Sequence, residues 1–258
     1  MGNFKTIGFI GGGRVTRFLL EGLKKAGYTT IKVQVHDPNK TLLEALRNDY
    51  NIVEAASNSE AAKADLVLLA VHPPVIKDVL TEIKDSIKPD SVILSLAPKI
   101  TVSFLQSALG VMQIARMIPN APSAICKGYN PVAFAEGIEP PIREKLYNIF
   151  TTWGNSPEVP ENMLEAYAII TAMGPTYFWF QWQTLRELAV KFGLSRTESD
   201  IALKSMIFGA AEYFFDSEIA PEKIIDTVPV KPLAEAEGAI KSIYESRLDS
   251  LYEKLKNK

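Results

Sequence analysis

Three consecutive glycines, Gly11 to Gly13, stand between a strand pattern and a helix pattern near the start of the chain. The preceding segment KTIGFIGG is apolar in the manner of a buried strand, and RVTRFLLEGLKKAG after it has apolar residues at helical spacing. Glycine costs backbone entropy in such a place, so consecutive glycines indicate that the fold or a ligand requires a bare backbone. This transition constrains the architecture more than any other feature of the sequence.

A strand, a GxGxxx turn and a helix within a βαβ unit form the arrangement that binds dinucleotides. In that arrangement Gly11 permits the tight turn, Gly13 lets the backbone approach a pyrophosphate, and the phosphates lie at the helix N-terminus. Thr16 occupies the third small position, where glycine or alanine is usual. The alternative is a tight glycine turn without a nucleotide, which the flanking strand and helix and the acid after the second strand argue against.

Asp37 ends the second strand pattern, IKVQVHD. An acid at this place binds the ribose hydroxyls of NAD and repels the 2′-phosphate of NADP. Arg14 and Lys40 are close enough in the sequence to offset that repulsion, so we expect NAD or NADP, with NAD favoured. The alternative for Asp37 is a purely local role as a cap or turn residue before Pro38.

Strand and helix patterns alternate through the first part of the chain. Continuous apolar runs are typical of parallel strands that are covered on both faces. The alternation predicts an α/β fold with a Rossmann-type, doubly wound, mainly parallel sheet. Further strand patterns are DLVLLAVHP, SVILSLAP, MQIARMIPN and NPVAFAEG, and further helix patterns are NKTLLEALRNDY and PVIKDVLTEIKDSI.

The alternation of strand and helix patterns ends at WGNSPEVPEN, which is rich in turn-forming residues. Only helical patterns follow, at 161–192 with a break near Gly174-Pro175, and at 196–215, 221–227 and 233–257. We therefore predict a dinucleotide-binding Rossmann domain over 1–160 and an all-helical domain for substrate binding and dimerisation over 161–258. A chain of 258 residues is long enough for two such domains.

Composition and charge exclude several classes of protein. The net charge of −2 offers no basic field to nucleic acid or to an anionic membrane surface. The longest apolar runs are too short to span a bilayer, and we expect no signal peptide before the first strand. Cys126 is the only cysteine, which fits a reducing cytoplasm. With two histidines, His36 and His72, and no HExxH motif, we expect no metal site.

Several segments together resemble the pyrroline-5-carboxylate reductase family, over residues 5 to about 215. IGFIGGGRVTRFLLEGL resembles the opening fingerprint of that family, and ADLVLLAVHP resembles its third nucleotide-binding strand. RMIPNAPSAICKGYNPV resembles its Arg-x-Met-Pro-Asn-x-Pro segment, and TAMGPTYFWFQWQTLRELAVKFGLSRTESD resembles the first long helix of its second domain and the turn after it.

The resemblance implies hydride transfer from a nicotinamide to a carbon–nitrogen double bond. It also implies a homodimer with interlocked helical domains, and an active site at the cleft that is partly shared between subunits. The positions that match the family's cofactor contacts are Gly11, Gly13, Arg14 and Val15 along the pyrophosphate, Ala70, Val71 and His72 on the ribose side, Ala97 near the nicotinamide ribose, and Asn58 on the adenosine side.

The departures from the family gather on substrate-facing segments. The family grips the carboxylate of its cyclic imino acid with a Ser-Pro-Gly-Gly-Thr-Thr loop, whereas TVPVKPLAEAEGA at 227–239 has no such glycine or threonine pair and offers Lys231. The family's Ala-Ala-Gly becomes Ala97-Pro98-Lys99, and its Ser-Gly-Ser-Gly becomes 171–174, TAMG. We therefore expect a retained cofactor site and a rebuilt substrate site, for another imine or a carbonyl compound.

Six residues are candidates for the reaction itself. His72 or Lys99 would donate a proton where the substrate is not already an iminium, and Thr171 stands where the family has its first serine. The predicted substrate contacts are Asn120, Thr176 and Lys231. The alternative for His72 and Lys99 is that both are solvent-facing loop residues beside the cofactor.

Other functions remain open from the sequence. One is a non-catalytic relative that binds a nucleotide and acts as a sensor or partner protein. A weaker one is a deazaflavin-dependent NADP reductase, against which Asp37 and the long helical domain argue. A lysine-dependent β-hydroxyacid dehydrogenase is disfavoured because no lysine lies between Met163 and Glu187. The aromatic segment PTYFWFQWQ predicts a helix buried in a core or a subunit interface, and less a substrate lining.

Overall fold

The computed structural model describes residues 4–28 and 30–256. Its contacts divide the chain into two units, Met1–Met173 with Leu251–Lys258, and Gly174–Ser250. This division falls later than the boundary near residue 160 that the change in sequence pattern indicates. The reason is packing, because Leu164 and Ala168 are buried against Ile118 and Ala133 of the first unit.

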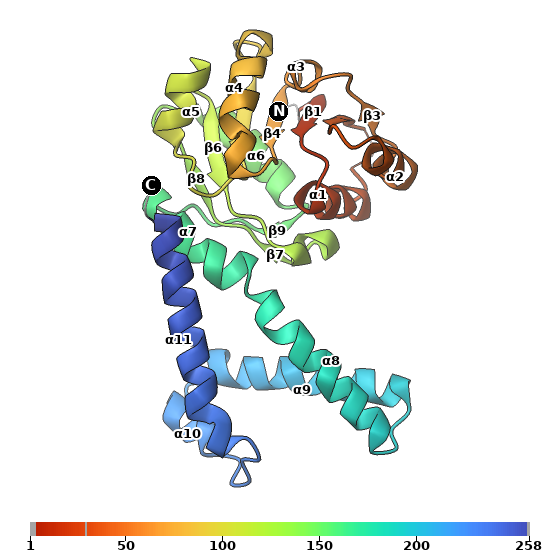
Figure 1. Cartoon of the computed structure of the whole chain (residues 1–258), viewed down its shortest axis with the longest axis vertical. Helices are drawn as coiled ribbons and strands as arrows, with labels where there is room; N and C mark the ends of the chain where they lie inside the picture. Colours follow the sequence, from red (N-terminus) through yellow and green to blue (C-terminus); the bar gives the residue numbers. More distant parts are fainter. Residues whose placement is uncertain (1–3, 29, 257–258) are drawn as a thin grey trace. The chain divides into compact units, whose positions relative to one another are not determined.

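The first unit contains a seven-stranded sheet in the order β3-β2-β1-β4-β5-β6-β8. All neighbouring pairs are parallel except β6 and β8, which are antiparallel. The predicted Rossmann-type, mainly parallel sheet is confirmed (Figure 1). The strands are β1 (Thr6–Ile10), β2 (Lys32–His36), β3 (Val53–Glu54), β4 (Leu66–Leu69), β5 (Val92–Ser95), β6 (Ile114–Met117) and β8 (Val132–Phe134), with a separate pair of β7 (Gly128–Tyr129) and β9 (Gly154–Asn155).

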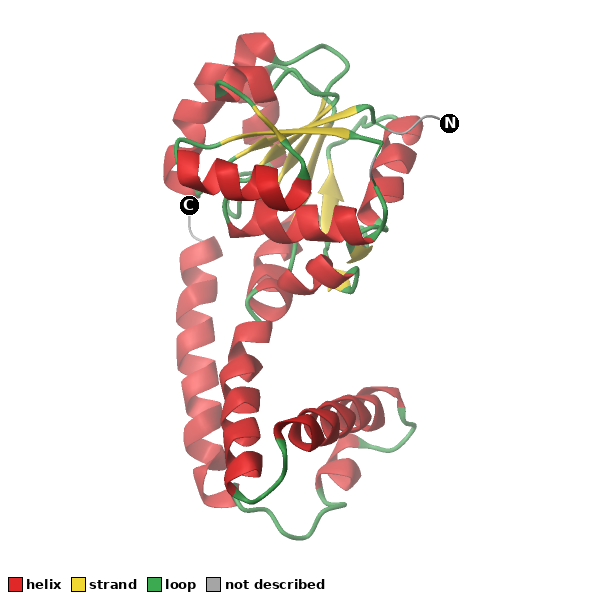
Figure 2. Ribbon diagram, turned by 90° about the vertical axis from the view of Figure 1, so that its right-hand side faces the viewer, coloured by secondary structure: helices red, strands yellow, loops and turns green. Residues whose placement is uncertain are grey.

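Helices cover both faces of the sheet, as Figure 2 shows. Side chains alternate between the faces along each strand, so Leu66 and Leu68 belong to one core and Val67 and Leu69 to the other. This two-sided burial is why the strands are continuously apolar in the sequence. The first core holds α1 (Arg14–Lys25), α2 (Lys40–Tyr50) and α6 (Pro140–Phe150), and the second holds α3 (Asn58–Ala61), α4 (Ile76–Ile83) and α5 (Val102–Leu109).

Short helical segments complete the first unit. Among them, η5 is a π-helix that follows directly on α7. A π-helical turn inside a helix often marks a functional site. Their bounds are η1 (Pro73–Val75), η2 (Lys84–Ser86), η3 (Ala121–Ile125), η4 (Glu161–Met163), α7 (Leu164–Tyr167) and η5 (Ala168–Ala172).

The second unit, over its described residues, is built from helices and their connections. Its helices are α8 (Pro175–Lys191), α9 (Arg196–Asp216), α10 (Pro221–Ile225) and α11 (Ala234–Lys256), whose last residues belong to the first unit. Pro175 begins α8, as the break in the sequence pattern indicates, because proline is suited to the first position of a helix. Residue 257, the predicted end of the last helix, lies outside the described residues. No helix in the described part of the chain is long and apolar enough to cross a membrane.

Candidate active site

The carboxyl ends of the parallel strands meet at one edge of the sheet. The strand order reverses between β1 and β4, and ligands of open α/β sheets bind outside this edge at such a reversal. Gly11 follows directly on β1, Asp37 on β2 and Ala70 on β4, and Ala97 lies just after β5. The topology therefore brings these sequence-predicted cofactor residues to a single edge.

Each of the three glycines has a different physical reason. Gly11 has a φ of 98°, and a Cβ on it would lie 2.7 Å from the carbonyl oxygen of Ala70. A Cβ on Gly12 would lie 2.5 Å from the Leu42 side chain, so this glycine lets α2 pack closely. A Cβ on Gly13 would meet no protein atom within 4 Å. The fold requires Gly11, Gly12 lets Leu42 pack against the turn, and Gly13 leaves space on the side where a ligand would lie.

The structure shows why threonine can stand at position 16, where glycine or alanine is usual. Its side chain is fully buried, and Oγ1 donates a hydrogen bond of 2.6 Å to the carbonyl oxygen of Gly11. The hydroxyl thereby satisfies a buried acceptor in the turn, which otherwise costs free energy. The larger side chain at this position supports the glycine turn.

Asp37 binds the glycine turn directly. Its Oδ2 accepts a hydrogen bond of 2.8 Å from the amide of Gly12, and its Oδ1 accepts one of 2.9 Å from the amide of Asn39. The local turn role that the sequence left as an alternative is therefore present. A carboxylate has about four lone-pair sites, so both oxygens keep capacity for the hydroxyls of a ribose.

A cavity of about 380 Å³ lies beside this turn, between the start of α1 and α2. Gly13 and Arg14 line it, as do Arg17, Asn39 and Thr41, for which the sequence predicts no role in the site. Helical spacing could have indicated Arg17, because it lies one turn after Arg14. Arg17 also pairs with Asp49 at 2.7 Å on the surface, an arrangement that water screens strongly.

The other predicted cofactor positions differ in their surroundings. The amide of Ala70 donates to the carbonyl oxygen of Ile10, which places Val71 and the exposed His72 at the edge beside β1. Val15 is half-buried and packs on the first core. Asn58 donates its side-chain amide to Glu82 at 2.7 Å, so this side chain links α3 to α4.

Asn120 and Thr171 lie in contact, and the contact joins the side chain of Asn120 to the backbone of Thr171. Asn120 is 7% exposed, its Oδ1 accepts from the amide of Tyr129, and its Nδ2 donates to the carbonyl oxygen of Thr171 at 3.2 Å. The Thr171 hydroxyl donates to the carbonyl oxygen of Tyr167 at 2.8 Å. Both side chains thus stabilise the π-helical segment η5, a role that the sequence did not predict.

The remaining predicted residues lie on two separate units. Lys99 is exposed on the loop after β5. Thr176 and Lys231 belong to the helical unit, where Thr176 lines a largely apolar cavity with Tyr244, and the Lys231 Nζ lies 3.4 Å from Asp226 Oδ1.

The residues present at the start of α1 fit a dinucleotide. Helix α1 has no side-chain cap and no acid in its first turn, and it carries Arg14 there. A helix N-terminus of this kind favours phosphate through its N–H groups and its dipole. Together with the open face of Gly13, this makes the turn complementary to a pyrophosphate.

Comparisons with known proteins agree with this geometry. A family model described as NADP oxidoreductase, coenzyme F420-dependent, matches residues 6–99, which hold the nucleotide-binding strands. The pyrroline-5-carboxylate reductase of Pseudomonas aeruginosa is 28% identical over 255 residues, covering 97% of this chain and 93% of its own. That of Escherichia coli is 28% identical, covering 87% of this chain and 84% of its own.

Solved structures show the same fold. The pyrroline carboxylate reductase of Plasmodium falciparum with NADP bound superposes with a TM-score of 0.82 at 23% identity, covering 99% of this chain and 98% of its own. The pyrroline-5-carboxylate reductase of Coxiella burnetii superposes with a TM-score of 0.70 at 26% identity, covering 98% and 95%. Fold, glycine turn and relatives define an NAD(P)-dependent oxidoreductase of the Rossmann type. Over nearly its whole length the chain is similar to pyrroline-5-carboxylate reductases.

Replacing Gly13 with alanine tests whether its open face belongs to a ligand. Because the added Cβ meets no protein atom within 4 Å, we expect an unchanged unfolding temperature. Affinity for NADH, measured by fluorescence titration, should fall by about tenfold or more. Gly11→Ala is the matched control, and should lower the unfolding temperature because of its positive φ. Wild-type affinity in Gly13→Ala would show that the turn does not hold the cofactor.

Proposed function

We propose that the protein reduces the C=N bond of a small imine, with a C=O bond as the alternative, using NADH or NADPH. The observation that carries this is the glycine turn at the strand-order reversal, with Gly13 open towards a ligand. Similarity to a pyrroline-5-carboxylate reductase over nearly the whole chain supports the same chemistry. The proposal places the cofactor on the first unit, along Gly11, Gly13, Arg14 and Val15.

The residues of the chain have distinct roles in this proposal. The cofactor, when bound, supplies the hydride. The turn and the start of α1 hold its phosphates, and Asp37 accepts from its adenosine ribose. Ala97, at the carboxyl end of β5, contacts the nicotinamide ribose. Reduction of an uncharged imine also places a proton on nitrogen, which Lys99 Nζ or the His72 imidazole donates.

The substrate we propose is an anionic imino acid held differently from that of the family. Lys231 offers one ammonium group, where a glycine- and threonine-rich loop would offer several backbone donors. The ammonium pairs with the largely exposed Asp226 at 3.4 Å. Exposed pairs of this kind contribute about 0–1 kcal/mol, so a substrate carboxylate can displace Asp226.

The first test is reduction of pyrroline-5-carboxylate by the purified protein, followed by cofactor absorbance with NADH and NADPH in parallel. We expect turnover of this compound or of another cyclic imino acid in a panel that also contains carbonyl compounds. Lys231→Ala should raise the KM for an anionic imine and leave the cofactor KM unchanged. Cofactor binding without turnover across the panel would overturn catalysis and favour the sensor or partner protein.

We also propose that the enzyme prefers NADH, because the Asp37 carboxylate repels a 2′-phosphate. Its two backbone hydrogen bonds orient the carboxylate without removing its charge. Arg14 and Arg17 beside the turn provide compensating charge, which allows NADPH to be used less efficiently.

Asp37→Ser tests this preference. The ratio of kcat/KM for NADH to that for NADPH should fall by about tenfold, or roughly 1.4 kcal/mol. Asp37→Asn removes the charge and retains one acceptor, so it should shift the ratio in the same direction with a smaller loss of stability. An unchanged ratio in both variants would show that Asp37 serves only the glycine turn.

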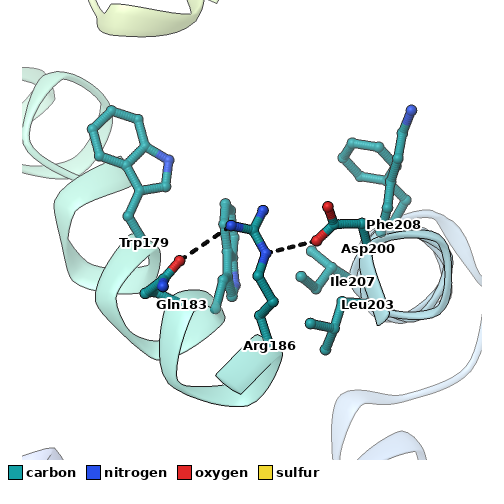
Figure 3. Close-up of a pocket in the computed structure, with 9 residues that line it drawn as sticks. Trp179, Gln183, Arg186, Asp200, Leu203, Ile207 and Phe208 are labelled. Atoms are coloured by element: carbon teal, nitrogen blue, oxygen red, sulfur yellow. Dashed lines mark hydrogen bonds and ion pairs between the residues drawn. The ribbon is translucent and has the colours of Figure 1, made fainter. Parts of the chain in front are cut away.

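We further propose that the protein is a homodimer formed through its helical unit. In α8, Phe178, Trp179 and Phe180 are each 45–65% exposed in the single chain, so the predicted burial in the chain's own core does not occur. A groove of about 520 Å³ separates α8 from α9, with an Arg186–Asp200 ion pair of 2.6 Å on its wall (Figure 3). Exposed apolar side chains gathered on one helix mark a protein interface. The resemblance implies that a second copy of the chain covers this surface.

Light scattering should therefore give twice the mass of one chain. Phe208→Glu, in the groove, should yield a monomer with a lower unfolding temperature, because the charge prevents burial of an apolar surface. Met112→Glu, at a position 58% exposed in the first unit, is the control and should leave the mass unchanged. A wild-type protein of single-chain mass would overturn the dimer.

The cytoplasm is the compartment we propose for the protein. Cys126 is a free thiol, and the sequence holds no second cysteine with which it could form an internal disulfide. A protein without internal disulfides fits a reducing compartment. The dinucleotide cofactor proposed above is consistent with the same location.

A further inference from the structure

We infer that Glu161 and Glu165, held by the buried Arg116, position the loop 97–102 for the nicotinamide end of the cofactor. The inference rests on the proposed function, because the loop matters only if a nicotinamide cofactor binds beside it. Ala97, at its start, is the predicted contact of the nicotinamide ribose, and Lys99 is a candidate proton donor. The two glutamates are positioning residues, because they act on the cofactor through the backbone of this loop.

The centre of the arrangement is one guanidinium group. Arg116 on β6 is 2% exposed, and its two terminal nitrogens donate to Glu161 Oε1 and to Glu165 Oε1, each at 2.8 Å. A buried charge is tolerated only where opposite charges and hydrogen bonds replace water. The glutamates lie four residues apart on η4 and α7, which places them on one helical face. The planar fork of arginine can engage both.

The same carboxylate oxygens also hold the loop. Glu161 Oε1 accepts a hydrogen bond of 2.7 Å from the amide of Val102, and Glu165 Oε1 accepts one of 3.2 Å from the amide of Lys99. The guanidinium, two carboxylates and two backbone amides thus form a continuous network from β6 to the loop after β5. We call the three side chains the Arg116 clamp.

The loop needs this support because of its backbone. Lys99 has a φ of 70°, in the left-handed region that side chains with a Cβ disfavour. The family that the chain resembles has glycine at this place. Glu165 binds the amide of this strained residue directly. The clamp therefore holds a lysine in a conformation that its own backbone preference opposes.

Packing fixes the loop on one side only, where Ile100 and Val102 contact the second core. A cavity of about 460 Å³ lies against the loop, lined by Lys99 and Thr101 together with Arg116, Glu161 and Glu165. Close packing is what normally fixes a buried segment, and the cavity leaves this side of the loop without it. Hydrogen bonds to the two carboxylates are therefore what fixes the position of the loop on this side.

The test compares Glu165→Ala with Glu165→Ala in a Lys99→Gly background. In the apoprotein, amide hydrogen exchange over 97–102 should become about tenfold faster in Glu165→Ala. Affinity for NADH, measured by titration without substrate, should fall by about tenfold. Because glycine adopts the left-handed conformation freely, the same change in the Lys99→Gly background should cost no more than about threefold.

Two further variants separate positioning from general damage. Glu158→Ala removes a carboxylate that pairs with Arg143 on the surface of the same unit, and should change neither readout. Glu165→Gln keeps an acceptor for the Lys99 amide, so it should recover part of the affinity, and it replaces Glu165→Ala if that variant does not fold.

Equal losses of affinity in the two backgrounds would overturn the inference, as would unchanged exchange over 97–102. Hydrogen exchange needs no cofactor, so it tests the clamp even if the proposed function fails. Faster exchange with no nicotinamide binding in the wild type would leave the clamp standing and refute the cofactor role.

Discussion

Gly11, the first residue after β1, lies where the neighbouring backbone leaves no room for a side chain. The amide of Gly11 bonds to the carbonyl oxygen of His36 at the end of β2, while the carbonyl group of Ala70 approaches from the end of β4. A side chain on Gly11 would push these two strand ends apart. Because the chain turns here within three residues, α1 begins at the sheet edge, and its uncapped N-terminus lies where a phosphate would bind.

Polar side chains around this edge mainly hold backbone in place. Asp37 binds the glycine turn, Thr16 satisfies the Gly11 carbonyl group, and Asn120 binds the carbonyl group of Thr171. Glu165 does the same for Lys99. A cofactor that runs along such an edge meets a surface whose loops are already ordered, and ordering them on binding would cost conformational entropy. Preorganisation of the edge therefore depends on hydrogen bonds from polar side chains to the backbone.

The two ends of the proposed site differ in how far they depart from the family. The dinucleotide turn retains its glycines and gains a supporting hydroxyl from Thr16. The loop after β5 replaces a glycine with Lys99 and holds it through the Arg116 clamp. In the helical unit, Lys231 stands in a proline-flanked segment where the family has backbone donors. The changes at Lys99 and Lys231 each introduce an ammonium group, a point charge that can pair with an anion.

The sequence by itself determined the type of the strands and helices that it predicted, although it did not indicate β3, α3, α5 or α6. Strands with two-sided apolar runs, amphipathic helices, the glycine turn and the helix break at Gly174-Pro175 depend on periodicity and local backbone preference, which neighbouring residues set. It also separated the role of Gly13 from that of Gly11. Only the tertiary structure decided that Asp37 binds Gly12 and decided the partners of Asn58 and Arg116, because these partners lie 25, 24 and 45–49 residues away along the chain. Which side chain meets which carboxylate depends on how distant segments pack, and local preference carries no information about that packing.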